Sequence, residues 1–314
     1  MKKKEFFTEY VPINEIQQFF MHYPAASRTV VIFLHGGPGQ TELFFTYLTR
    51  PQIPSCSFVF YDQRGTGKTQ IRNRTHPDDI TLDILIDDLH ETVAYIREKY
   101  AGQQIILLGH SWGSVLGIEY VKRYPVYVSA YVGMGQVIDM LKSERIAFEE
   151  LKSLVVSKGK TRSIQHIKSF EGYPDNLDKD HYTETTLRFR RLQAKYGYSI
   201  GLVDMLTKII KSPLFSLRDA QPFLTTFKTN KNLMDMLMAY STINDMEFHL
   251  PIFFICGQND WQAPGVLVKQ YYDSLRAPYK EIYWIENAGH LTDIDNPAEY
   301  NKTIAAIRAT IEGR

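Results

Sequence analysis

One apolar run leads directly into a serine between two glycines: Ile105-Ile106-Leu107-Leu108-Gly109-His110-Ser111-Trp112-Gly113. The apolar residues are typical of a buried strand, and a helical segment is expected from about Val115 to Tyr124, where Pro125 ends it. A strand, a tight turn and a helix therefore surround Ser111. Such a strained turn holds a serine hydroxyl away from the backbone, as a nucleophile requires. The glycines are needed because neighbouring backbones come too close there for a Cβ atom.

Strands and helices alternate on both sides of this turn. The expected strands cover residues 9–23 (two strands that turn near Asn14), 29–34, 57–61, 104–108, 128–133, 251–256 and 280–285. Further helices are expected at residues 81–100, 264–275 and 297–311. This order predicts an α/β fold, with a mostly parallel central sheet that has helices on both faces.

The middle of the chain has a different pattern. Residues 137–248 contain amphipathic helical segments but no convincing strand, and no Pro/Gly/Ser-rich linker flanks them. We therefore expect a single α/β core formed by residues 1–136 and 249–314, with residues 137–248 inserted as a helical cap.

Composition excludes several classes of function. The 36 Lys and Arg residues nearly balance the 35 Asp and Glu residues, so we expect neither a nucleic acid nor a membrane as a partner. No signal peptide and no apolar run of membrane-spanning length is evident, which favours a cytoplasmic protein. Cys56 and Cys256 lie in apolar runs and are expected as buried free thiols. The nine histidines have no metal-ligand spacing, and the segment Gly65-Thr66-Gly67-Lys68-Thr69 lacks the first glycine of a phosphate-binding loop. No cofactor is expected.

Two later strands end in residues that could activate Ser111. Asp260 follows the expected strand 251–256, and His290 follows the strand 280–285. In hydrolases whose nucleophile stands on such a turn, the chain order is serine, acid, histidine. Since parallel strands gather an active site at their carboxyl ends, we expect Ser111, Asp260 and His290 to form a catalytic triad.

A serine nucleophile also needs two backbone N–H groups that stabilise the developing oxyanion. One donor is expected from Trp112, the residue after the nucleophile. The second is expected from Gly37 in the loop His35-Gly36-Gly37-Pro38-Gly39, with Gly36 as the alternative.

Together these motifs resemble one family. The loop at residues 35–39, the segment Asp62-Gln63-Arg64-Gly65-Thr66-Gly67, the turn around Ser111 and the loops carrying Asp260 and His290 look like those of prolyl iminopeptidases, which are α/β-hydrolases. The resemblance covers roughly residues 9–136 and 249–314 and implies release of an N-terminal residue, often proline, from small peptides. Thr69 stands where the family pattern has serine. Arg64 is expected to support the site structurally and not to act as a catalytic residue.

An aminopeptidase needs a carboxylate that pairs with the substrate ammonium group. The candidates in residues 137–248 match no family motif; they are Glu149, Glu184, Asp245 and Glu247, with Glu150, Glu171 and Asp235 as further acids. Two alternatives therefore stay open: an esterase or other hydrolase of small acyl substrates, and a ligand-binding protein of the same fold without turnover. Epoxide hydrolase and dehalogenase chemistry would need aspartate in place of Ser111.

Overall fold

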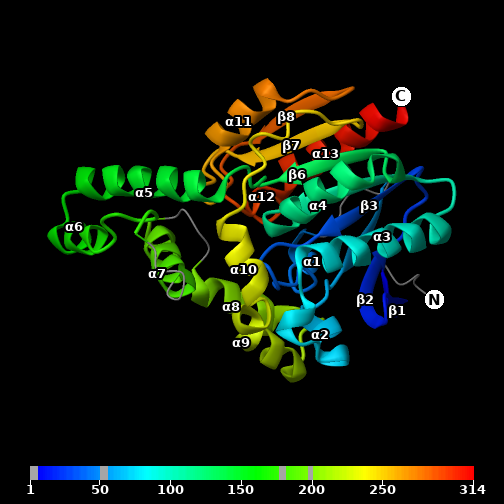
Figure 1. The fold of residues 1–314 in the computed structure, drawn as a ribbon, viewed down its shortest axis with the longest axis horizontal. Helices are drawn as coiled ribbons and strands as arrows, with labels where there is room; N and C mark the ends of the chain where they lie inside the picture. Colours follow the sequence, from blue (N-terminus) through cyan, green and yellow to red (C-terminus); the bar gives the residue numbers. More distant parts are fainter. Residues whose placement is uncertain (1–5, 50–55, 177–181, 197–200) are drawn as a thin grey trace.

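The central sheet has eight strands in the order β1-β2-β4-β3-β5-β6-β7-β8 (Figure 1). The structure, a computed structural model, describes residues 6–49, 56–176, 182–196 and 201–314. Antiparallel pairs join β1 to β2 and β2 to β4, and every other neighbouring pair is parallel. The strands are β1 (Phe7–Ile13), β2 (Ile16–Tyr23), β3 (Thr29–Leu34), β4 (Ser57–Tyr61), β5 (Gln104–His110), β6 (Ala130–Met134), β7 (Ile252–Gly257) and β8 (Lys280–Ile285). The predicted α/β fold with a mostly parallel sheet is confirmed.

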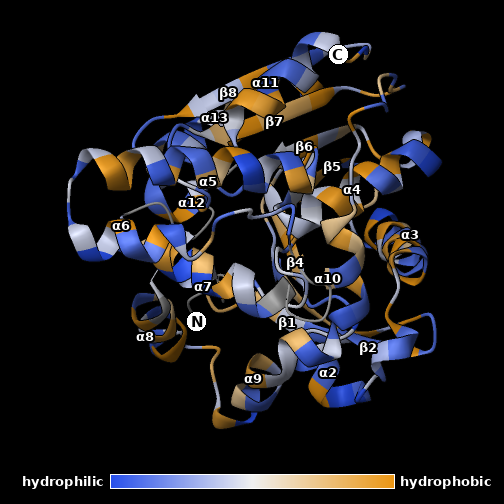
Figure 2. Ribbon diagram, turned by 60° about the vertical axis from the view of Figure 1, so that its left-hand side comes forward, coloured by the Kyte–Doolittle hydropathy of each residue, from blue (hydrophilic) through white to orange (hydrophobic). Residues whose placement is uncertain are grey.

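Two apolar cores lie on opposite faces of the sheet. Successive residues of β3 alternate between them, with Ile32 in one core and Phe33 in the other. Helices α3 (Leu82–Lys99), α4 (Trp112–Arg123) and α11 (Gly265–Ser274) cover one face, and α13 (Pro297–Glu312) covers the other. Figure 2 shows the result: apolar strands inside, and helices such as α3 with one apolar side. All residues of β3 and β7 are buried, as parallel strands between helices require.

Helix boundaries near the serine differ from the prediction. Helix α4 begins at Trp112, directly after Ser111, and not near Val115, because the glycines of the turn allow the helix to start without an intervening loop. A short helix, α2 (Gly67–Asn73), was not predicted, since its glycine and polar residues have no apolar period. In contrast, α3 has the expected cap: the Thr81 hydroxyl accepts a hydrogen bond from the Ile84 N–H at 3.3 Å.

The described residues between β6 and β7 form helices that extend to one side of the sheet (Figure 1). These are α5 (Met140–Ser157), α6 (Thr161–Lys168), α7 (Tyr182–Lys195), α8 (Leu202–Lys211), α9 (Ala220–Thr229) and α10 (Lys231–Met238). The two ends of this segment lie side by side, because the Met140 N–H donates to the Tyr240 carbonyl and the Thr242 N–H donates to the Ile138 carbonyl. We refer to residues 137–248 as the helical segment.

The Asp62–Gly67 segment contains a buried ion pair. The Arg64 guanidinium donates to both carboxylate oxygens of Asp88, at 2.8 and 2.9 Å, and to the Asn14 carbonyl at 3.1 Å. The Arg64 and Asp88 side chains are 10% and 2% exposed, so water does not compete for these bonds. Arg64 therefore ties the loop after β4 to α3 and to the turn between β1 and β2.

We predict that Arg64→Ala lowers the free energy of unfolding by about 3–5 kcal/mol, because it leaves the Asp88 carboxylate buried without its cation. Urea denaturation followed by circular dichroism measures this loss. Arg28→Ala is the matched control: its pair with Glu312 spans 3.5 Å and its side chain is 74% exposed, so a change below about 1 kcal/mol is expected. Equal losses in the two variants would contradict this interpretation.

Candidate active site

Ser111 occupies a strained turn between β5 and α4. Its backbone has φ 53° and ψ −117°, a conformation that residues with a Cβ rarely adopt. A Cβ atom on Gly113 would collide with the Leu34 carbonyl oxygen, and one on Gly109 would collide with the Gly113 carbonyl oxygen. Both glycines of the motif are thus required by close backbone contacts. The Ser111 N–H donates to the Met134 carbonyl at 3.0 Å, which fixes the turn against β6.

Asp260 and His290 meet at the carboxyl ends of β7 and β8. Nδ1 of His290 lies 2.9 Å from Oδ2 of Asp260, while Oδ1 of Asp260 accepts the N–H groups of Gln262 and Ala263, each at 2.9 Å. Burial alone would raise the pKa of Asp260, but the His290 ring and the two N–H groups hold it below its ordinary value. Asp260 is therefore a carboxylate, and His290 donates its Nδ1–H to it.

This pair lies beside the serine turn. A Cβ atom on Gly135, the residue after Met134, would lie 3.0 Å from Cε1 of His290 and 3.3 Å from Oδ2 of Asp260. His110, which precedes Ser111, has its ring centroid 4.9 Å from that of His290. The Asp260–His290 pair therefore lies next to Gly135 and to His110, the residue before Ser111.

His110 anchors the loop that carries His290, a role that the sequence did not predict. Its Nε2 lies 2.9 Å from the His290 carbonyl oxygen, and since a carbonyl only accepts, His110 is the donor. Burial, together with the nearby His290, lowers the pKa of His110 to about 3, so the ring is neutral. The only sequence signal is its place inside the serine motif, where the pattern allows any residue.

The glycine-rich loop after β3 lies against Ser111. A Cβ atom on Gly36 would lie 3.4 Å from Cβ of Ser111. Gly37 has φ +120°, which favours glycine. The backbone N–H groups of Gly37 and Trp112 donate no hydrogen bond to another residue in the described part of the chain, as expected of groups that face a substrate oxygen.

Gln63 connects this loop to the serine turn. Its backbone N–H donates to Nε2 of His35 at 3.1 Å, and its side-chain amide donates to the His35 carbonyl at 3.3 Å. Its amide oxygen accepts the indole N–H of Trp112 at 3.0 Å. Burial lowers the pKa of His35 to about 4, so this ring is neutral and its Nδ1–H donates to the Gly36 carbonyl. One glutamine therefore contacts both loops that carry the proposed oxyanion donors.

Two buried carboxyl groups lie behind His290, and the sequence reasoning missed both. Glu42 follows the glycine-rich loop, and Asp293 lies in α12 (Thr292–Asp295). Burial raises the pKa of both groups; the nearby Asp293 raises that of Glu42 further, and Asp295 raises that of Asp293. Both groups therefore keep their proton to a higher pH than an exposed carboxyl group does.

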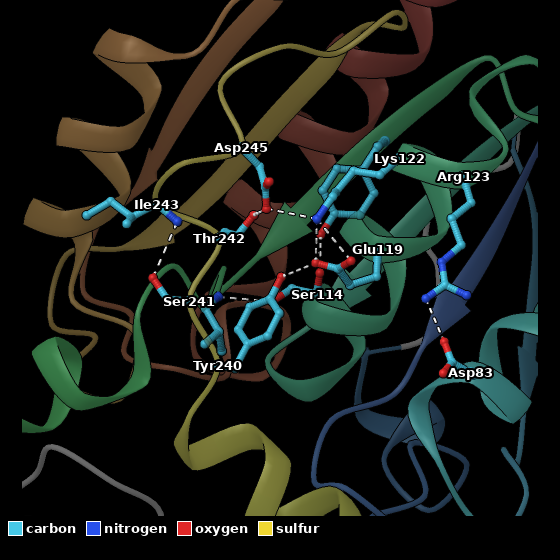
Figure 3. A network of polar contacts seen from close by, with 12 residues as sticks. Asp83, Ser114, Glu119, Lys122, Arg123, Tyr240, Ser241, Thr242, Ile243 and Asp245 are labelled. Atoms are coloured by element: carbon cyan, nitrogen blue, oxygen red, sulfur yellow. Dashed lines mark hydrogen bonds and ion pairs between the residues drawn. The ribbon is translucent and has the colours of Figure 1, made fainter.

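The acids considered for amine binding have varied surroundings. Asp245 contacts Lys122 at 2.8 Å (Figure 3). Lys122 is eleven residues after Ser111, so it lies about 16 Å farther along α4. Glu149 lies 3.5 Å from Lys152, and Asp235 lies 3.1 Å from Lys231. Glu171, Glu184 and Glu247 are exposed, as are Glu149 and Glu150. The backbone of Glu247 forms an isolated parallel β-bridge with Arg276.

Glu150 is placed differently. It lines a cavity of about 330 Å³ together with Gln193 of α7 and Trp261, the residue after Asp260. Neither an ion pair nor a hydrogen bond to its carboxylate occurs within the described residues. Glu150 is thus an acid of the helical segment that faces a cavity next to the Asp260 loop.

Glu144, not considered from the sequence, is buried in the helical segment. It accepts hydrogen bonds from the Tyr173 hydroxyl and the Arg190 guanidinium. Because Arg190 neutralises it, Glu144 is not available for a substrate cation. Within the described residues, no group of His, Cys, Asp and Glu is placed to hold a metal ion, and no helix is long and apolar enough to cross a membrane.

Comparisons with known proteins find relatives along nearly the whole chain. "Probable aminopeptidase YbaC" of Bacillus subtilis is 24% identical over 298 residues, which cover 93% of this chain and 92% of that protein. A proline iminopeptidase of Lactobacillus delbrueckii subsp. bulgaricus is 24% identical over 289 residues, 90% of each chain. The crystal structure of the proline iminopeptidase of Mycobacterium smegmatis superposes with a TM-score of 0.69 at 16% identity and covers 97% of this chain and 98% of that one.

A family profile described as alpha/beta hydrolase fold matches residues 29–297. The match spans the sheet from β3 to β8, the serine turn and both loops that carry Asp260 and His290. The chain belongs to the alpha/beta hydrolase fold family, with relatives named as aminopeptidases.

Proposed function

We propose that the protein is a serine aminopeptidase that releases an N-terminal residue, with a preference of the proline type, from short peptides. The observation that carries the proposal is the buried Asp260–His290 pair, 2.9 Å between oxygen and nitrogen, beside a serine held in a strained turn. The names of the two curated relatives support a peptide substrate.

The proposed reaction begins with proton transfer. His290 accepts the proton of Ser111 as the serine oxygen attacks the carbonyl carbon of the N-terminal residue. Asp260 keeps His290 in its Nδ1–H tautomer and stabilises the His290 cation. The pKa of Asp260 lies below its ordinary value, so its carboxylate is charged and can do this. The backbone N–H groups of Trp112 and Gly37 stabilise the oxyanion.

Two further steps complete the turnover. His290 donates its proton to the leaving amine as the carbon–nitrogen bond breaks, which leaves the N-terminal residue esterified to Ser111. A water molecule then attacks this ester while His290 takes a proton from it. The bond between the carbonyl carbon and Oγ of Ser111 breaks, His290 returns the proton to that oxygen, and the N-terminal residue leaves as a free amino acid. The reaction needs no redox partner.

We further propose that the helical segment acts as a cap and that Glu150 receives the substrate ammonium. Trp261 lines the same cavity as Glu150, and its indole would pack against the pyrrolidine ring of an N-terminal proline. Glu149, Asp235 and Asp245 each contact a lysine, so an ammonium would compete with a cation already present.

We expect Ser111→Ala to lower kcat/KM for an aminoacyl anilide by at least about three orders of magnitude, because it removes the nucleophile. The same variant should not react with a fluorophosphonate probe, whereas the wild type should carry the probe on the Ser111 peptide in mass spectra. Ser274→Ala, on the exposed side of α11, is the control and should behave as the wild type. Near-normal hydrolysis by Ser111→Ala would rule out the proposed mechanism.

Glu150→Gln should lower kcat/KM about tenfold for anilides with a free amine, because it removes a charge-assisted contact to the ammonium. Anilides of the same residues with an acetylated amine should change less than about twofold, since they carry no ammonium. Glu149→Gln, one position earlier on α5, is the matched control and should affect neither series. Equal effects of Glu150→Gln on free and blocked substrates would contradict amine binding. A wild type that cleaves blocked amides or simple esters as well as free-amine substrates would favour the esterase alternative.

The buried carboxyl groups behind His290 should make stability depend on pH. Burial raises the pKa of Asp293 to about 7, so the folded protein retains a proton that the unfolded chain releases near pH 4. The free energy of unfolding should therefore fall as the pH rises from about 4 to about 7. Asp293→Asn should reduce this fall by on the order of 2 kcal/mol in urea titrations. Asp78→Asn, at an exposed position, should leave the slope unchanged, and an unchanged slope in Asp293→Asn would refute the assignment.

A further inference from the structure

Helix α9 of the helical segment is bonded directly to the two loops that support the serine turn. The Thr226 hydroxyl donates to the Gly39 carbonyl at 2.7 Å. The Asn230 amide, at the end of α9, donates to the Gly65 carbonyl at 3.2 Å and to the Thr226 carbonyl at 3.0 Å. Both side chains are buried, with the residues 5% and 1% exposed, so water does not replace these bonds.

The fit between α9 and the two loops is tight. A Cβ atom on Gly39 would collide with both the Asn230 amide and the Thr226 hydroxyl, and one on Gly65 would lie 3.0 Å from Oδ1 of Asn230. Gly39 and Gly65 have φ values of +81° and +79°, which favour glycine. Asn230 therefore lies between the two loops and leaves no room for either to move toward α9.

A buried ion pair holds the start of α9 in place. Asp219, in the turn before α9, is 1% exposed and contacts Nζ of Lys68 in α2 at 2.9 and 3.1 Å. The same aspartate accepts the Ser216 N–H at 2.7 Å. Both ends of α9 are thus fixed to the core near the glycine-rich loop.

These contacts reach both proposed oxyanion donors. Gly39 is two residues from Gly37, and Pro38 between them restricts the backbone, so an anchored Gly39 limits where the Gly37 N–H points. Gly65 is two residues from Gln63, which bonds to His35 and to the Trp112 indole. Since an oxyanion donor is effective only at the right position, small shifts of either loop would slow the reaction.

We propose that Thr226 and Asn230 are positioning residues that hold the oxyanion loop, so that the helical segment contributes to the rate of acylation as well as to substrate selection. The inference rests on the proposed function of Ser111. A purely structural role for α9 predicts something else: loss of stability without a change in the reactivity of Ser111 in folded protein.

The test uses the rate at which a fluorophosphonate labels Ser111, because this reaction needs the oxyanion hole but no particular substrate. Thr226→Val removes the hydroxyl with little change in shape and should lower the labelling rate constant about tenfold, less than the loss of a donor itself. On an aminoacyl anilide, kcat should fall by a similar factor while KM changes less than twofold. Thr226→Ser keeps the hydroxyl and should restore the wild-type rate.

Thr225→Val is the matched control, since Thr225 is exposed and its hydroxyl contacts only the Gln221 carbonyl of its own helix among the described residues. Rates are compared well below the melting temperature of each variant, and Thr226→Ala replaces Thr226→Val if the valine variant does not fold. Wild-type labelling rates in the Thr226 variants would overturn this inference and leave the proposed function intact. A wild type that the probe does not label would overturn the proposed function, and this inference with it.

Discussion

The backbone at Ser111 constrains the rest of the site. A residue with φ 53° at the end of β5 can be accommodated only because Gly109 and Gly113 allow α4 to pass against the Leu34 carbonyl. This contact joins β3, β5 and α4 so closely that the glycine-rich loop after β3 must lie beside the serine. The parallel order of β5, β6, β7 and β8 then places Asp260 and His290 at the same edge of the sheet.

Around this turn, burial sets the charge of each group. His35 and His110 are neutral because burial lowers their pKa values to about 4 and about 3. Asp260 stays ionised although it is buried, because His290 and two backbone N–H groups stabilise its carboxylate. Neutral histidines beside an ionised Asp260 suit a histidine that must gain and lose a proton during each turnover.

Much of this arrangement could be predicted from the sequence. Apolar strands separated by amphipathic helices indicate the sheet, and loops at strand ends indicate where Ser111, Asp260 and His290 gather. Contacts between distant residues could not be predicted: His110 and His290 are 180 positions apart, and Thr226 and Gly39 are 187 apart. Short-range patterns carry no information about such pairs. The acids of the helical segment are a second example. The sequence does not distinguish Glu150, which lines a cavity, from acids such as Glu149 that contact a lysine; the folded structure does.

In the proposed mechanism, Ser111 carries the N-terminal residue of the substrate as an ester during each turnover. Rapid acid quench of the protein during hydrolysis of a prolyl ester, followed by peptide mass spectrometry, measures this intermediate directly. We expect an added prolyl group on the peptide that contains Ser111, and none when the substrate amine is acetylated. An acyl group on another residue, or equal acylation of Ser111 by the acetylated ester, would contradict this mechanism.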